Sequence, residues 1–120
     1  NVLWDPEGER GVIDFYFACD DALLYDVAIA VNDWCQDDRH TLDPERAGAF
    51  LAGYDRLRPL TDLERELWPV MLRRAALRTW LGRLEYEHFP VASQITIPKD
   101  HDGSRRLLES HIATARPLEA

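Results

Sequence analysis

Asp14 stands within an apolar stretch, residues 11–17 (GVIDFYF), whose other side chains are mostly aliphatic or aromatic. A carboxylate with such neighbours loses hydration when they pack, and that loss is costly unless a partner compensates it. Asp14 is therefore either a strand-end residue with its carboxylate in a site or an ordinary strand-end residue in solvent. A hard divalent cation would suit the first alternative, because Mg²⁺ binds oxygen ligands and takes few of them from the protein.

Asn1 is the second candidate oxygen donor. Residues 2–4 read as a short apolar strand, and residues 5–8 (DPEG) have the residue types of a type I turn. If residues 11–15 form the return strand, antiparallel pairing brings Asn1 and Asp14 to the open end of one hairpin. An amide oxygen and a carboxylate at that end would suit Mg²⁺, which fills its remaining positions with water and phosphate.

The elements after the hairpin read as helices. Apolar residues recur with helical spacing from residue 22 to about residue 36. Asp43 directly before Pro44 predicts the start of a second helix, because aspartate caps helices and proline suits the first helical position. We expect this helix to end just before Pro59, where the chain leaves the helical pattern.

Thr61 and Glu64 have the spacing of a capping box and predict a third helix, which Pro69 should kink or restart. Residues 91–102 read as a loop and residues 104–116 as a last short helix. The expected buried face of the third helix consists of Leu63, Leu67, Val70, Met71, Leu77, Leu81 and Leu84.

The sequence thus predicts a mainly α fold in one piece, with a metal-site hairpin in residues 1–15 and about four helices in residues 16–120. The formal net charge of −8 argues against nucleic acid or an anionic membrane as a partner, although solubility alone could explain it. Cys19 and Cys35 lack the spacing of a zinc site and lie among apolar residues. We therefore expect buried free thiols and a cytoplasmic protein.

Several stretches resemble the aminoglycoside phosphotransferase and choline kinase group of kinase-like enzymes. They are Asn1 followed by a short hairpin, residues 11–15 (GVIDF) and residues 25–28 (YDVA). Residues 17–35 (FACDDALLYDVAIAVNDWC) resemble more narrowly the homoserine kinases of that group. Residues 72–84 (LRRAALRTWLGRL) add a second stretch of the same resemblance.

The resemblance implies that the chain is part of the C-terminal lobe of a kinase-like fold that uses ATP and Mg²⁺. Asn1 matches the last position of a catalytic loop that helps to hold magnesium, and Asp14 matches the aspartate that bridges magnesium to the ATP phosphates. Asp26 matches an aspartate that braces the catalytic loop. The catalytic aspartate and the N-terminal lobe would precede Asn1, so we expect no catalytic residue in this chain and no activity without that missing part.

The implied substrate is a small alcohol or amino acid, most narrowly homoserine, whose ammonium and carboxylate each need a partner. Three aspartates could bind the ammonium group, with Asn32 and Trp34 as neighbours: Asp20, Asp21 and Asp33. Arg78, or Arg74, could bind a carboxylate with two hydrogen bonds.

Other interpretations remain open at this point. Asp20 and Asp21 could cap the helix that follows them, and the arginines could be solvated or ion-paired on a helix surface. The same fold could also phosphorylate choline, an aminoglycoside or a sugar. A non-catalytic helical interaction module is an alternative of another class.

Overall fold

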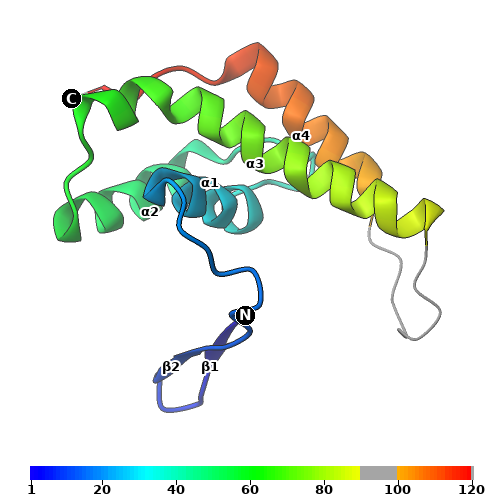
Figure 1. Ribbon diagram of the computed structural model, residues 1–120. Coiled ribbons are helices and arrows are strands. Elements are labelled where there is room, and N and C mark those ends of the chain that lie inside the picture. The colour runs from blue at the N-terminus through cyan, green and yellow to red at the C-terminus, as the bar shows by residue number, and fades with distance from the viewer. Residues whose placement is uncertain (90–99, 120) are drawn as a thin grey trace.

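The computed structural model describes residues 1–89 and 100–119, and within them a β-hairpin is followed by four helices (Figure 1). The predicted mainly α fold is therefore confirmed. The expected loop at residues 91–102 lies mostly outside the described residues. The elements are β1 (Val2–Trp4), β2 (Arg10–Val12), α1 (Leu23–Trp34), α2 (Pro44–Leu57), α3 (Asp62–His88) and α4 (His101–Thr114).

The two strands form an antiparallel hairpin in which Val2 lies opposite Val12. The predicted turn is present, since the N–H of Gly8 donates to the carbonyl of Asp5 at 3.1 Å. The return strand is shorter than expected and ends at Val12 rather than at residue 15. Asp14 explains the difference, because its φ of 65° lies in the left-handed region and cannot continue a strand.

The residues predicted to cap the second and third helices do so. Asp43 accepts hydrogen bonds from two backbone N–H groups at the start of α2, and Thr61 and Glu64 form a complete capping box at the start of α3. The last helix begins three residues earlier than predicted. Asp100 caps it by accepting from the N–H groups of Asp102 and Gly103 at 2.9 and 3.2 Å.

The long helix α3 packs against α1 and also against α4, so that it forms the centre of the helical body (Figure 1). The predicted buried face of α3 is largely wrong, because Leu63, Leu77 and Leu81 are exposed. The buried side of α3 instead contains two adjacent alanines, Ala75 and Ala76, whose small side chains let the neighbouring helices approach closely. The buried residues of α3 are Trp68, Pro69, Leu72, Ala75 and Ala76.

Pro69 lies inside α3, which continues through it without a break, so the expectation of a restart is wrong. Proline has no N–H and leaves the carbonyl four residues earlier, that of Arg65, without its helical donor. In this structure the N–H of Leu118 donates to that carbonyl at 3.0 Å. The side chain of Leu118 also packs against the core, so the C-terminal segment is held along α3.

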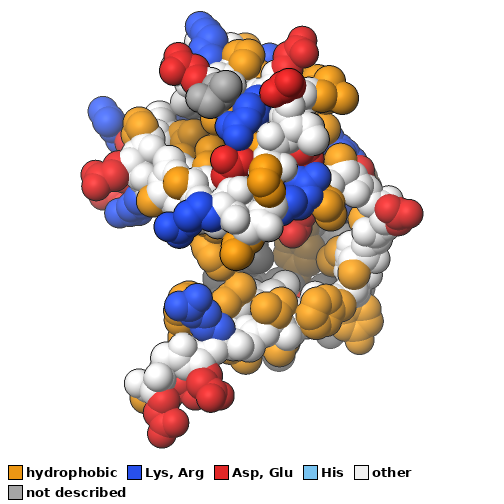
Figure 2. All heavy atoms as spheres, turned by 90° about the vertical axis from the view of Figure 1, so that its left-hand side faces the viewer, with side chains coloured by type: hydrophobic (Ala, Val, Ile, Leu, Met, Phe, Trp, Pro, Cys, Tyr) orange, Lys and Arg blue, Asp and Glu red, His pale blue; other side chains and the backbone are white. Residues whose placement is uncertain are grey.

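Residues 1–21, here called the N-terminal arm, project from the helical body with every residue exposed except the half-buried Val2 (Figures 1 and 2). Cys19 lies in this arm and is exposed, so its predicted burial is wrong, whereas Cys35 is buried in the core as predicted. Among the described helices, none combines the length and the apolar character needed to cross a membrane.

Candidate active site

The open end of the hairpin carries the two predicted metal ligands. The N–H of Ile13 donates to the carbonyl of Asn1 at 3.0 Å, so these residues lie opposite each other and Asp14 follows directly. Both Asn1 and Asp14 are exposed rather than buried among apolar groups. The strand register therefore brings both residues to one end of the hairpin, and a shared metal ion stays a prediction.

Asp14 has a conformation that few residues other than glycine adopt, with φ of 65°. Such backbone strain is often found at functional positions. Among the described residues, no group of three or more His, Cys, Asp or Glu side chains could hold a metal ion. One amide and one carboxylate nevertheless fit Mg²⁺, which keeps several waters and shares its remaining positions with substrate phosphates.

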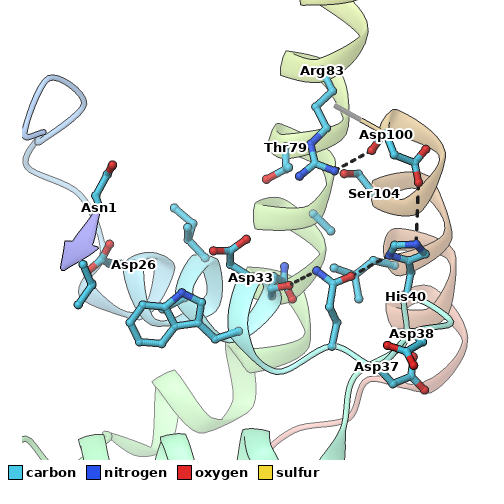
Figure 3. Close-up of a pocket in the computed structure, with 18 of the residues that line it drawn as sticks. Asn1, Asp26, Asp33, Asp37, Asp38, His40, Thr79, Arg83, Asp100 and Ser104 are labelled. Atoms are coloured by element: carbon cyan, nitrogen blue, oxygen red, sulfur yellow. Dashed lines mark hydrogen bonds and ion pairs between the residues drawn. The ribbon is translucent and has the colours of Figure 1, made fainter. Parts of the chain in front are cut away.

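An open groove of about 830 Å³ lies between the hairpin and the helices (Figure 3). The hairpin forms one wall, α1 and the loop after it form the floor, and α3 and α4 contribute the far side. The polar lining residues are Asn1, Asp26, Asn32, Asp33, Gln36, Asp37, Asp38, His40, Thr79, Arg83, Asp100 and Ser104.

The groove includes four of the residues singled out from the sequence, namely Asn1, Asp26, Asp33 and Trp34. The structure does not bring Asp14, Asp20 or Arg78 into its lining. Asp33 and Trp34 occupy the last turn of α1, whereas Asp26 lies two turns earlier on the same helix, at the side where Asn1 is found (Figure 3). The role of Asp26 as a brace stays a prediction.

Several polar residues of the groove were not predicted as site residues from the sequence, and two of them, Thr79 and Arg83, belong to α3. They lie four positions apart on α3 and therefore share one face of that helix. Arg78 is turned about 140° away from Arg83, because five residues of an α-helix make one turn and about 140° more. The terminal nitrogen Nη1 of Arg83 donates to the carbonyl of Asp100 at 2.7 Å, which holds the guanidinium at the groove.

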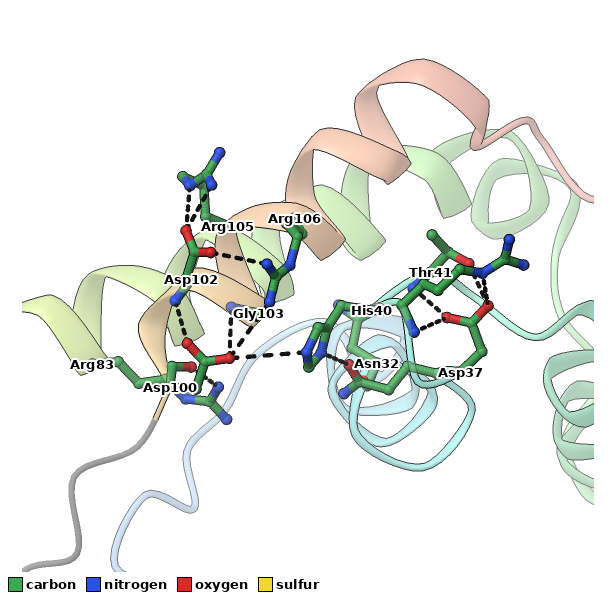
Figure 4. A network of polar contacts seen from close by, with 12 residues as sticks. Asn32, Asp37, His40, Thr41, Arg83, Asp100, Asp102, Gly103, Arg105 and Arg106 are labelled. Atoms are coloured by element: carbon green, nitrogen blue, oxygen red, sulfur yellow. Dashed lines mark hydrogen bonds and ion pairs between the residues drawn. The ribbon is translucent and has the colours of Figure 1, made fainter.

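His40 links the loop after α1 to the start of α4 (Figure 4). Its Nδ1 atom lies 3.0 Å from Oε1 of Gln36, and its Nε2 atom lies 3.9 Å from Oδ2 of Asp100. The ring packs against Gly103 so closely that a Cβ atom at that glycine would lie 2.7 Å from Cε1 of His40. The contact fixes one side of the groove, so His40 has a structural role there.

Asp37 also belongs to this loop, and its carboxylate is turned toward Thr41. The backbone N–H and the hydroxyl of Thr41 donate to it at 2.9 Å each, and these bonds lower the pKa of Asp37 to about 2. Asp37 is therefore ionised at neutral pH and fixed within its own loop. The groove as a whole is acidic, because its lining contains one arginine, Arg83, and five aspartates, namely Asp26, Asp33, Asp37, Asp38 and Asp100. Such a lining favours a cationic group.

A family model described as the phosphotransferase enzyme family matches residues 1–60 of this chain. The chain belongs to the phosphotransferase enzyme family. The matched residues include the hairpin, α1 and the loop with His40, and so supply most of the lining of the groove.

The chain is also similar to curated proteins named homoserine kinase. It is 52% identical to that of Methylobacillus flagellatus over 120 residues, which are 100% of this chain and 38% of the relative. It is 55% identical to that of Pseudomonas aeruginosa over 84 residues, 70% of this chain and 27% of the relative. For Neisseria meningitidis serogroup B the identity is 43% over 110 residues, 92% of this chain and 36% of the relative. The chain thus spans 38% or less of each.

Proposed function

We propose that the full-length protein is a homoserine kinase, which transfers the γ-phosphoryl group of ATP to the hydroxyl of homoserine on the path to threonine. The observation that carries this proposal is the 52% identity to a homoserine kinase over all 120 residues. Because the chain spans 38% of that relative, the remaining part of the protein would supply the catalytic aspartate and the ATP-binding lobe. Free thiols at Cys19 and Cys35 are compatible with a cytoplasmic enzyme.

In this proposal the side chains of Asn1 and Asp14 hold the magnesium ion. When bound, Mg²⁺ neutralises charge on the phosphate oxygens during transfer. The exposed hairpin end leaves both side chains accessible to a nucleotide bound by the missing lobe. Asp26 would brace the catalytic loop beside Asn1, which lines the same groove.

The groove offers both charges that a zwitterionic amino acid requires. Asp33, with Trp34 beside it, would bind the ammonium group, and Arg83 rather than Arg78 would bind the carboxylate (Figure 3). The nitrogen Nη1 of Arg83 is used by the carbonyl of Asp100, so Nε and Nη2 are the atoms for the substrate. Asp20 lies outside the groove lining and is not part of this proposal.

The test is ADP release by the purified full-length protein with Mg²⁺ and ATP. Homoserine, choline, an aminoglycoside and a sugar are supplied separately, and the product is identified by ³¹P NMR. We expect phosphate transfer to homoserine at a rate well above that with the other alcohols. Selective activity with another alcohol would reassign the substrate within the same family. No transfer to any alcohol would contradict the kinase proposal and favour a non-catalytic interaction module.

A further inference from the structure

The N-terminal arm is fastened to the helical body at one point. Nη2 of Arg74 donates to Oδ2 of Asp21 at 2.6 Å, and Nη1 donates to Oδ1 at 3.3 Å. The guanidinium carbon of Arg74 also lies 3.8 Å from the centre of the Tyr25 ring. Among the described residues, no other hydrogen bond or ion pair joins residues 1–21 to residues 23–119. We call Asp21, Arg74 and Tyr25 the arm clamp.

The geometry of the arm clamp is specific. Two parallel hydrogen bonds between a guanidinium and a carboxylate fix orientation as well as distance, and stacking on an aromatic ring restricts the guanidinium further. The hydrogen bond from Arg74 lowers the pKa of Asp21 and raises the pKa of Arg74, so both groups are charged at neutral pH. Solvent screens the pair, because both side chains are partly exposed.

The clamp also tests the earlier interpretation of Asp21 as a helix cap. A capping role would require the carboxylate to accept hydrogen bonds from the second or third residue of α1. The cap residue of α1 is Ala22, which has no side-chain capping bond. Within the described part of the chain, Asp21 accepts only from the N–H of Ala22 and from Arg74. Asp21 is thus used to attach the arm rather than to cap α1.

Nearly all side chains of the arm are exposed in the part of the protein that the structure describes. Asp14 precedes Asp21 by seven residues within this arm. On the other side of the clamp, Tyr25 is adjacent to the groove residue Asp26. A displacement of the arm at Asp21 would therefore move Asp14 relative to the groove.

We infer that Arg74 is a positioning residue: by holding Asp21, it fixes the position of the segment that carries Asp14 relative to the groove. The inference rests on the proposed function, because it uses Asp14 as a metal ligand. Arg74 touches neither the metal nor the substrate in this proposal. Its effect is therefore on metal affinity and turnover, whereas substrate affinity depends on Asp33 and Arg83.

The test compares the full-length wild-type protein with Arg74→Ala, Arg74→Lys and Arg56→Ala. Affinity for Mn²⁺ in the presence of ATP is measured by electron paramagnetic resonance, and kcat and the KM for homoserine are measured in parallel. Arg56 is the matched control, since it is exposed on α2 and makes no hydrogen bond or ion pair with any described residue. For Arg74→Ala we expect Mn²⁺ affinity and kcat to fall by about 10- to 100-fold, with the KM for homoserine unchanged.

Arg74→Lys keeps the charge but loses the paired hydrogen bonds, so an intermediate defect is expected. Asp21→Asn removes the carboxylate that pairs with Arg74 without shortening the side chain. It should lower Mn²⁺ affinity and kcat as Arg74→Ala does. The exchanged pair Arg74→Asp with Asp21→Arg should recover part of the Mn²⁺ affinity. Unfolding of Arg74→Ala is not expected, because alanine is the best helix former and the position is partly exposed.

The outcomes separate this inference from the proposed function. Equal Mn²⁺ affinity and kcat in Arg74→Ala and Arg56→Ala would overturn the role of Arg74. If wild type binds Mn²⁺ with ATP but does not phosphorylate homoserine, the proposed substrate fails, and the Mn²⁺ comparison still decides on Arg74. A wild-type protein without any Mn²⁺ binding would contradict both.

Discussion

His111 on α4 and Asn32 on α1 meet inside the core, with Nε2 of the imidazole 2.8 Å from Oδ1 of the amide. The exposed fractions of the two residues are 1% and 7%. Nδ2 of Asn32 donates to the carbonyl of Leu72 on α3 at 3.0 Å. Because that amide nitrogen is the donor, Oδ1 is the acceptor and Nε2 of His111 carries the hydrogen. One polar path thus joins three helices.

This pair predicts loss of stability in acid. Burial lowers the pKa of His111 from 6.5 to about 4, so between these values the unfolded protein binds a proton that the folded protein does not. Stability from neutral His111 is therefore full above pH 6.5 and is lost as the pH falls toward 4. We expect this residue alone to reduce the free energy of unfolding by about 3 kcal/mol across that interval. Urea denaturation at several pH values measures it.

The control for this effect is His111→Gln, which keeps an amide donor for Asn32 but does not titrate. The variant should be less stable than wild type at pH 7, and its stability should depend less on pH between 6.5 and 4. An unchanged pH slope in the variant would show that other groups, such as the paired carboxylates, cause the acid sensitivity.

Asp14→Asn tests the proposed metal ligand in the full-length protein. The change is nearly isosteric and removes one charge, so folding should stay close to wild type. Turnover should fall by about 100-fold or more, in the range of losses seen when charge stabilisation at a transition state is removed. The measurements are kcat at saturating Mg²⁺ and thermal unfolding, with Glu7→Gln as an exposed control in the same hairpin. Equal kcat in the two variants would exclude a metal role for Asp14.

Asp33→Asn tests recognition of the ammonium group in the groove. Hydrogen bonds to charged groups contribute about 1.5–3 kcal/mol, so the KM for homoserine should rise by about 10- to 100-fold. Affinity for Mn²⁺ should not change, since Asp33 is on α1 and the proposed ligands are on the hairpin. Asp62→Asn, an exposed residue at the start of α3, serves as the control. A defect in Mn²⁺ affinity with normal KM would argue against this assignment.

Gly103→Ala tests the contact between α4 and His40. Alanine normally stabilises a helix interior relative to glycine by about 0.5–1 kcal/mol. Here the new Cβ would lie 2.7 to 2.9 Å from three atoms of the His40 ring, so we expect destabilisation of about 1–3 kcal/mol instead. In a His40→Ala background the same change should become stabilising. Chemical denaturation of the four proteins in this cycle gives both values, and a stabilising effect with His40 present would contradict the close contact.

Local chemistry was enough to predict the elements. The turn at Asp5, the cap at Asp43 and the capping box at Thr61 each depend on residues within four positions of one another. The register that brings Asn1 near Asp14 followed from the same turn. These features could be predicted because they need no knowledge of distant contacts.

The side of α3 that faces the core could not be predicted in the same way. Leucines and alanines both recur along this helix, and only the approach of α1 and α4 decides that Ala75 and Ala76 are buried and Leu77 is exposed. The choice of Arg83 over Arg78 for the groove follows from the same rotation. The contact of Asp21 with Arg74 joins positions 53 residues apart and leaves no local pattern.

Pro69 gives the C-terminal segment a docking point that does not depend on side-chain identity. The acceptor is the main-chain oxygen of Arg65, and the donor is the main-chain nitrogen of Leu118. As far as this bond is concerned, position 118 tolerates any amino acid that retains its amide hydrogen, and proline alone is forbidden. Substitutions in the C-terminal segment can therefore weaken its apolar packing, while the hydrogen bond that attaches this segment to α3 is kept.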